Sequence, residues 1–314
     1  MTDPPLSPPA ATAPEAPTAQ PHSTAQPPDT APPDPAAVLR ARLDAGLRNL
    51  ALCIAYDGGP FMGWQVQPHG PTVQGRLEEA LRVLTRRPTT LYGSGRTDAG
   101  VHAYNQVANA WLPAGQDLGK LRAGLNGLAG PDISVKALAW ADPEFHARHS
   151  AQGKCYRYLV FNRPYPPLFE RTRCWWVRPP LDVEAMRAAA ARLLGEHDFS
   201  AFRAKDCAAA SPVRRMRAIT LSLAGPPEEA LRVDLEASGF LQHMARIVVG
   251  TLVAVGLGKL TADDVAAILA GRRREGAAAT APPQGLHLLR VDYDQKRFPE
   301  LRALLADDPA AGTP

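Results

Sequence analysis

The stretch YGSGRTDAGVHA (residues 92–103) places an arginine and an aspartate, Arg96 and Asp98, in a loop rich in glycine. Glycine has no Cβ, so the glycines of this stretch permit turns that a side chain would block. Short strands are predicted before it, at TTLYGSG (89–95), and after it, at YNQVANAWL (104–112). Loops held by a sheet often carry functional groups, which makes Asp98 the first candidate site residue. The alternative is an aspartate that accepts backbone N–H groups in a turn, with Arg96 in solvent.

Hydrophobic patterning on both sides of this loop predicts two α+β halves. Apolar runs and alternation predict strands, and apolar residues three or four apart predict helices. The remaining predicted strands are 50–56, 133–141, 155–161, 218–224, 231–237 and 285–293. The predicted helices are 72–87, 117–130, 182–199, 241–256 and 261–271. Because the same order recurs, we expect two antiparallel sheets, each with helices on one face, and a boundary near residues 148–153.

Composition divides the chain further. Of the 32 prolines, 12 lie in the first 36 residues, which contain no Lys or Arg. Such a segment cannot bury enough apolar surface to offset the entropy of ordering it. We therefore expect a disordered extension over 1–47, an N-terminal α+β domain with Asp98 over 48–150, a C-terminal α+β domain over 151–296, and a tail over 297–314.

The predicted folded part is basic. The first 36 residues contain four acids and no base, so the remainder has 35 basic and 27 acidic side chains. This excess suits a polyanionic partner. Three clusters contribute: Arg82, Arg86 and Arg87; Arg214, Arg215 and Arg217; and the segment 271–275. Such clusters bind phosphates or are merely solvated faces, and both interpretations stay open.

The cysteines, histidines and apolar runs bear on compartment and cofactors. None of the four cysteines has CxxC spacing, which is typical of reduced thiols in a cytoplasmic protein. The apolar run IVVGTLVAVGLG (247–258) is too short to cross a bilayer, so no membrane contact is expected. His102, His146 and His149 lack the further ligands of a metal site. We expect no metal, and a structural hydrogen bond from His102 at the start of its strand.

The run GRTDAGVHA (95–103) resembles the signature of the tRNA pseudouridine synthase A family. Six further segments resemble blocks of that family in the same order: AYDGGPFMGWQ (55–65), VQGRLEEAL (73–81), FHARHSAQGKCYRY (145–158), LLGEHDFSAFR (193–203), FLQHMARIVVGTL (240–252) and GLHL (285–288). The resemblance spans roughly residues 48–296. One departure is Ile247, which stands where the family usually has asparagine.

The resemblance implies an enzyme that converts uridine to pseudouridine at positions 38, 39 and 40 in the anticodon stem-loop of tRNA. It implies no cofactor or metal, and a homodimer whose clefts use both subunits. The implied fold has two ferredoxin-like domains of the RRM type around a central RNA-binding cleft. Asp98 is implied to be the catalytic aspartate. Whether it attacks the sugar, attacks the base or abstracts a sugar proton stays open.

Residue chemistry agrees with that implication. Breaking a glycosidic bond calls for a nucleophile or an anion beside C1′, and a hydrolase needs a second carboxylate to activate water. No second acid accompanies Asp98 in its segment, which favours an isomerase over a nucleoside hydrolase. A catalytically silent RNA-binding protein is the other alternative, yet a carboxylate beside RNA phosphates is repulsive there. A pseudouridine synthase that acts on ribosomal RNA is a further alternative, but it would share only the use of a catalytic aspartate.

Three further site residues follow from the resemblance. Arg246, in HMARI, is the implied ion-pair partner of Asp98, since a nearby guanidinium lowers the pKa of a carboxyl group and orients it. Arg96 is implied to enter the space left when the target base flips out of the stack. Tyr156, in KCYRY, is implied to stack on that base, although by itself it could be a core aromatic of a strand.

Overall fold

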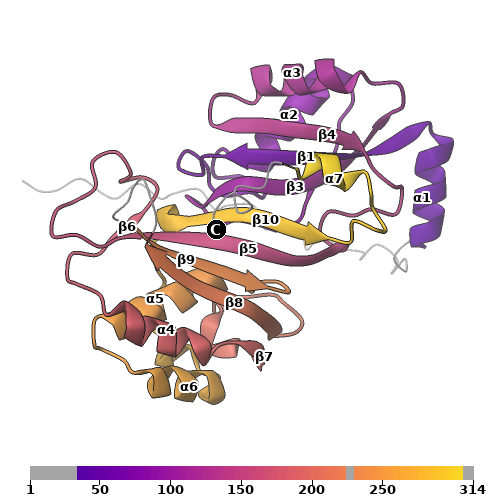
Figure 1. Ribbon diagram of the computed structural model, residues 1–314. Coiled ribbons are helices and arrows are strands. Elements are labelled where there is room, and N and C mark those ends of the chain that lie inside the picture. Colours follow the sequence, from indigo (N-terminus) through magenta and orange to yellow (C-terminus); the bar gives the residue numbers. More distant parts are fainter. Residues whose placement is uncertain (1–33, 224–229, 307–314) are drawn as a thin grey trace, which may run out of the picture.

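The computed structural model describes residues 34–223 and 230–306 and shows a mixed α+β fold with one large sheet (Figure 1). The strand order is β4–β1–β3–β10–β5–β9–β8–β7, and the short strands β2 and β6 pair with β3 and β5. The strands are β1 Leu47–Tyr56, β2 Tyr92–Gly93, β3 His102–Pro113, β4 Ile133–Trp140, β5 Ala151–Phe161, β6 Trp175–Trp176, β7 Gly195–Asp198, β8 Val213–Leu223, β9 Ala230–Ala237 and β10 Leu286–Tyr293. The helices are α1 Pro35–Asp44, α2 Val73–Thr85, α3 Leu118–Leu128, α4 Val183–Ala191, α5 Met244–Gly256, α6 Ala262–Gly271 and α7 Leu301–Leu304.

Strand β10 joins the two halves of the chain. It pairs antiparallel with β5, and it pairs parallel with β3, where His287 lies opposite His102 and Leu288 opposite Ala103. The sheet is therefore continuous from β4 to β7, with helices against both halves (Figure 1). The sequence analysis expected two antiparallel sheets and did not foresee this parallel connection, because a two-residue pairing leaves no pattern in the sequence.

Strand β1 explains the apolar centre of the N-terminal half. It lies between β3 and β4, and its residues from Asn49 to Ile54 are almost fully buried. Helix α7 contacts β1 and β4. A strand buried on both faces reads as a continuous apolar run, which is why LALCIAY was recognisable in the sequence.

Helix α5 forms the core of the C-terminal half and starts at the site described below. Eleven of its residues are buried, as expected for a helix that is apolar on all sides. The chain segment 277–281 crosses it so closely that a Cβ at Gly250 would lie 2.1 Å from the carbonyl oxygen of Ala279. This crossing also brings Ala281 against the first turn of α5.

Both ends of the described chain differ from the expectation. Within the predicted disordered extension 1–47, residues 35–44 form α1, and the Arg42 guanidinium lies over the Trp111 ring at 5.1 Å. The prediction for residues 1–33 falls outside the described residues. Within the predicted tail 297–314, Phe298, Leu301 and Leu304 are buried. Their spacing of three is a helical signal that was overlooked, and residues 307–314 fall outside the described part.

The helix predicted over 182–199 is shorter. Helix α4 ends at Ala191, and residues 195–198 form the edge strand β7 against β8. Gly195 has a φ of 103°, a conformation that ends helices and favours glycine. A four-residue strand carries too little alternation to be separated from a helix by its pattern.

Candidate active site

The loop between β2 and β3, which carries Asp98, packs against the segment 57–64. The Trp64 N–H donates to the carbonyl oxygen of Thr97 at 3.1 Å. Gly63 has a φ of 93°, and a Cβ on it would lie 2.5 Å from that same oxygen. Only glycine allows this close approach. The backbone on either side of Asp98 is therefore fixed by a second loop that lies far from it in sequence.

A buried polar network fixes the other side of the loop. The Tyr56 hydroxyl lies 2.9 Å from Thr97 Oγ1, and Gln106 Nε2 donates to the carbonyl of Gly95 at 3.1 Å. Ser94 Oγ donates to Gln106 Oε1 at 2.6 Å. Burial raises the pKa of Tyr56 to about 12, so its hydroxyl keeps its proton and its donor capacity. A satisfied network of this kind gives the loop one conformation.

Asp98 meets Arg246 across the two halves of the chain. Arg246 Nη1 donates to Asp98 Oδ2 at 2.7 Å, and the Arg246 side chain is 13% exposed. Its Nε donates to the carbonyl oxygen of Ala281 at 2.8 Å, and the Ala281 N–H donates back to the Arg246 carbonyl at 3.2 Å. The guanidinium is therefore oriented before any substrate binds. The Asp98 side chain remains 27% exposed, so its carboxylate is accessible.

Tyr156 reaches the same site from β5. It is 7% exposed, and its ring lies edge-on to Phe240 with centroids 5.0 Å apart. Burial raises the pKa of Tyr156 well above its usual value, and the nearby Tyr56 and Asp98 raise it further. The phenol is therefore neutral at physiological pH. The predicted contact of Arg246 with Asp98 is present in the structure, and Tyr156 lies near enough for the charge of Asp98 to raise its pKa.

Arg96 differs from those residues. It is exposed on the Asp98 loop and has no hydrogen bond or ion pair with any residue that the structure describes. Its side chain is thus available to a ligand. Arg96 is near the other site residues only because it precedes Asp98 by two residues in the same loop.

Two site residues escaped the sequence analysis. His243 Nε2 lies 3.5 Å from Asp98 Oδ2. His243 precedes Arg246 by three residues and is the N-cap residue of α5, and this closeness to Arg246 in the sequence could have identified it. Lys154 Nζ donates to the carbonyl of Ser94 at 2.9 Å, directly behind the Asp98 loop. Lys154 precedes Tyr156 by two residues, so both share one face of β5.

A cavity of about 490 Å³ opens beside His243. His243 and Ile247 of α5 line it, together with Arg274 and the segment 277–280. Ile247 is the residue that replaces the asparagine usual in the family, and it is fully buried. The Asp98–Arg246 ion pair forms without that amide.

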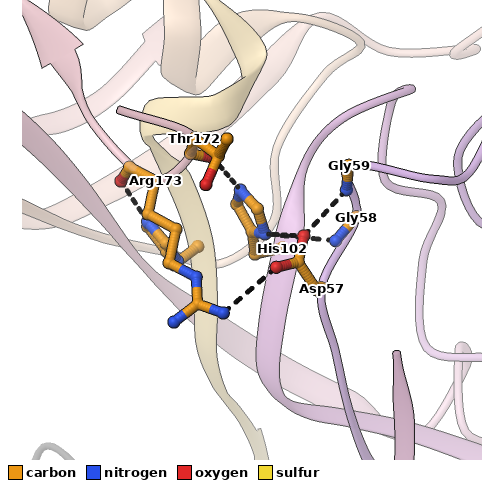
Figure 2. Close-up of polar contacts among 7 residues, drawn as sticks. Asp57, Gly58, Gly59, His102, Thr172 and Arg173 are labelled. Atoms are coloured by element: carbon orange, nitrogen blue, oxygen red, sulfur yellow. Dashed lines mark hydrogen bonds and ion pairs between the residues drawn. The ribbon is translucent and has the colours of Figure 1, made fainter. Parts of the chain in front are cut away.

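His102 stabilises the start of β3 as expected (Figure 2). Its Nδ1 accepts the Gly58 N–H at 3.1 Å, so Nε2 carries the proton and donates to the Thr172 carbonyl at 3.1 Å. Burial lowers the pKa of His102. The contact of Nδ1 with Asp57 Oδ1 at 3.2 Å becomes an ion pair only if the ring is protonated.

The three basic clusters are partly engaged within the protein. Arg82 pairs with Glu79 at 2.6 Å, Arg217 contacts Asp292 at 3.5 Å, and Arg272 contacts Asp198 at 3.5 Å. The arginine of each pair is exposed, and the Arg82–Glu79 pair is exposed on both sides, so these contacts are weak enough to exchange for phosphates. RNA binding by the clusters stays a prediction.

The described part of the chain offers neither a metal cluster nor a membrane-spanning helix. Within residues 34–223 and 230–306, no group of three His, Cys, Asp or Glu side chains is placed to hold a metal ion. In the same ranges, no helix has both the length and the apolar character that a bilayer span requires.

Comparison with known proteins identifies the family. A family model described as tRNA pseudouridine synthase matches residues 189–294. A tRNA pseudouridine synthase A from Geobacter sp. (strain M21) is 46% identical over 250 residues, which are 79% of this chain and 100% of the relative. One from Myxococcus xanthus is 46% identical over 245 residues, or 78% of this chain and 92% of the relative. An archaeal box H/ACA sRNP Nop10–Cbf5 crystal structure aligns with a TM-score of 0.30 and 14% identity over 76% of this chain and 47% of that chain, too weakly for any conclusion. On the strength of the relatives at 46% identity, the chain belongs to the tRNA pseudouridine synthase A family.

Proposed function

We propose that this chain converts uridine to pseudouridine at positions 38, 39 and 40 in the anticodon stem-loop of tRNA, with Asp98 as the catalytic group. The observation that supports this most is the Asp98–Arg246 contact of 2.7 Å in a chain of this family. In the reaction, the N1–C1′ bond breaks, the base turns, C5 bonds to C1′, the C5 hydrogen leaves as a proton, and N1 takes up a proton. No atom is gained or lost, so neither cofactor nor water is consumed.

The carboxylate is asymmetric in a way that suits this role. Arg246 and His243 both contact Oδ2 of Asp98, whereas Oδ1 accepts no hydrogen bond from any described residue. Oδ1 is therefore the oxygen we assign to the reacting atoms. The Arg246 guanidinium on Oδ2 orients the carboxylate and leaves Oδ1 facing the space where a substrate would lie.

The two remaining roles concern the target base. Tyr156 stacks on it, and Arg96 fills the space that it leaves in the RNA. Flipping a base costs a few kcal/mol, and less for a mismatched base. Arg96→Ala should therefore slow modification of a paired uridine more than that of a mismatched one. Equal slowing of both substrates would contradict this role for Arg96.

The finer architecture belongs to the same proposal. The divisions 48–150 and 151–296 correspond to two ferredoxin-like domains with a central RNA-binding cleft. The active form is a cytoplasmic homodimer whose clefts use both subunits. Sedimentation equilibrium of the purified protein tests the dimer, and a monomer that is fully active on tRNA would contradict it.

The decisive experiment measures tritium release from tRNA labelled at C5 of uridine, with substrates that retain one target uridine each. Wild type should release tritium from each substrate, and Asp98→Asn should release none while still binding tRNA. Asp263→Asn is the matched control, because Asp263 lies on α6 with its side chain 88% exposed. Tritium release by Asp98→Asn would show that Asp98 is not the catalytic group. If wild type bound tRNA without releasing tritium, the protein would be a catalytically silent RNA-binding protein. If it released tritium only from labelled ribosomal RNA, the substrate would be ribosomal RNA and not tRNA.

A further inference from the structure

Exposed apolar side chains gather on the loop between β5 and β6, residues 163–173 (RPYPPLFERTR). Phe169 is 90% exposed, Leu168 is 68% exposed and Tyr165 is 50% exposed. Phe169 is the most exposed large hydrophobic residue in the described ranges. Scattered apolar residues need no explanation, but three within five positions form a patch, which is typical of a binding surface.

The loop is built to hold this patch in place. Arg171 Nη1 donates to the Leu168 carbonyl at 3.0 Å, and the Arg173 N–H donates to the Glu170 carbonyl at 2.8 Å. Trp176 Nε1 donates to the Arg163 carbonyl at 2.9 Å and closes the base of the loop. The loop also contains three prolines, which restrict its backbone. Little conformational entropy is therefore left to lose when a ligand binds.

The base of the loop is fastened to the end of the sheet that carries the active site (Figure 2). The rings of His102 and His287 stack with centroids 4.7 Å apart and donate to the carbonyls of Thr172 and Arg173. Arg173 Nη2 also donates to Asp57 Oδ2 at 3.1 Å. His102 follows Asp98 by four residues. Figure 1 shows the chain between β5 and β6 projecting beyond this end of the sheet.

The charge of the segment complements nucleic acid. Residues 163–178 contain four arginines and one acid, Glu170, interleaved with exposed aromatic rings. Arg171 and Arg178 have no carboxylate partner among the described residues. Aromatic faces stack on unpaired bases of any sequence, and neighbouring arginines contact phosphates and base planes.

We propose that the 163–173 loop is an accessory RNA-binding site, in which Phe169 stacks on an unpaired base of the substrate away from the reacting uridine and Arg171 contacts the adjacent phosphate. This inference rests on the proposed function for the identity of the RNA as tRNA. A second copy of this chain is the poorer occupant. A two-fold interface at this loop would gather the arginines of both copies with only one acid from each copy to offset them, whereas RNA supplies the opposite charge.

The test compares Phe169→Ala, Phe169→Trp and the control Leu223→Ala, which removes an apolar side chain that is 68% exposed on β8. Binding of unmodified tRNA is measured by filter retention, and turnover by tritium release. Because stacking of one base is worth about 1–3 kcal/mol, Phe169→Ala should raise Kd at least about fivefold. Its kcat at saturating tRNA should equal that of wild type. Phe169→Trp should bind as tightly as wild type, and Leu223→Ala should change neither quantity.

Two outcomes would overturn the proposal. An unchanged Kd for Phe169→Ala, with the fold confirmed by circular dichroism, would show that the loop does not contact RNA. A raised Kd accompanied by dissociation of an oligomer in sedimentation would assign the loop to a protein interface instead. The proposed function fails separately: if wild type binds tRNA without releasing tritium, the Kd comparison still decides the role of the loop.

Discussion

Two arginine–aspartate pairs in this molecule have similar burial but different construction. Arg157 and Asp234 lie opposite each other on β5 and β9, and two hydrogen bonds of 2.8 Å use both carboxylate oxygens. Asp98 and Arg246 are 148 residues apart in sequence, and the single bond between them leaves Oδ1 of Asp98 unused. Side-chain exposures are 17% and 25% in the first pair and 13% and 27% in the second. Burial and charge alone therefore do not distinguish a structural pair from a reactive one.

The difference lies in what each carboxylate can still do. Asp234 is satisfied by its neighbour, and the contact raises the pKa of Arg157 through hydrogen bonding and charge. Asp98 is oriented by its arginine but keeps one oxygen and a quarter of its surface for a ligand. A carboxylate whose two oxygens are both hydrogen-bonded holds two strands together. A carboxylate with one free oxygen, in a contact between the two halves of the chain, is a candidate catalytic group.

Among changes that leave Asp98 in place, the largest effect is expected from Arg246→Met. This change removes the one arginine that contacts Asp98 among the described residues, and also the bond to the Ala281 carbonyl. Loss of one preorganised charged donor costs on the order of 10²–10³ in kcat. We expect tritium release to fall by that factor while tRNA binding changes little. A variant with more than a tenth of the wild-type kcat would show that the two pairs are functionally alike.

A second large effect is expected from Gly63→Ala, which acts on Asp98 without changing any charge. A Cβ there would lie 2.5 Å from the Thr97 carbonyl, so the Asp98 loop must shift. Because a displacement of about 1 Å can cost 10²-fold in rate, kcat should fall about 10- to 100-fold. Gly127→Ala is the matched control, since nothing lies within 4 Å of its Cβ position. Equal activity of both variants would mean that the loop tolerates movement.

The opposite pattern is expected from Arg157→Met. It leaves Asp234 without its partner, and one lost charged hydrogen-bond partner costs ~1–3 kcal/mol of folding free energy. The melting temperature should therefore fall, while kcat stays within about twofold of wild type at a temperature where the variant is folded. A variant that is stable but inactive would place Arg157 in the active site, and the comparison with Arg246 would no longer hold.

The sequence indicated the Asp98–Arg246 pair better than it indicated the architecture around that pair. Asp98 stood out because it lies in a glycine-rich loop, whereas Arg246 was assigned as its partner by the family resemblance of the segment HMARI. The parallel pairing of His287 with His102 involves too few residues to leave a pattern in the sequence. Gly63 was not singled out from the sequence, because its partner at Thr97 is defined only by tertiary packing. Lys154 was not singled out either, although it contacts the loop that carries Asp98.

Unlike Arg157 and Arg246, the buried cation Lys154 has no carboxylate partner among the described residues. Its ammonium donates to the Ser94 carbonyl, and a Cβ on Gly95 would lie 2.2 Å from Nζ. Burial, and secondarily the charge of Arg148, lowers the pKa of Lys154 from 10.5 to about 8. The folded protein therefore binds one proton fewer than the unfolded chain between about pH 8 and 10.5.

The sign of this linkage gives the smallest predicted effect. Where the unfolded state binds more protons, stability rises with pH, so wild type should gain relative to Lys154→Met between about pH 8 and 10.5. The gain is at most about 1.4 kcal/mol per pH unit, and below pH 8 the difference between the two proteins should be constant. Urea unfolding at a series of pH values measures it, with Lys120→Met on the exposed side of α3 as the control. If the difference in unfolding free energy between wild type and Lys154→Met did not change with pH, the Lys154 ammonium would be stabilised in the fold as well as an ammonium with a carboxylate partner. Lys154 would then belong with Arg157, as a charge that the fold has fully satisfied.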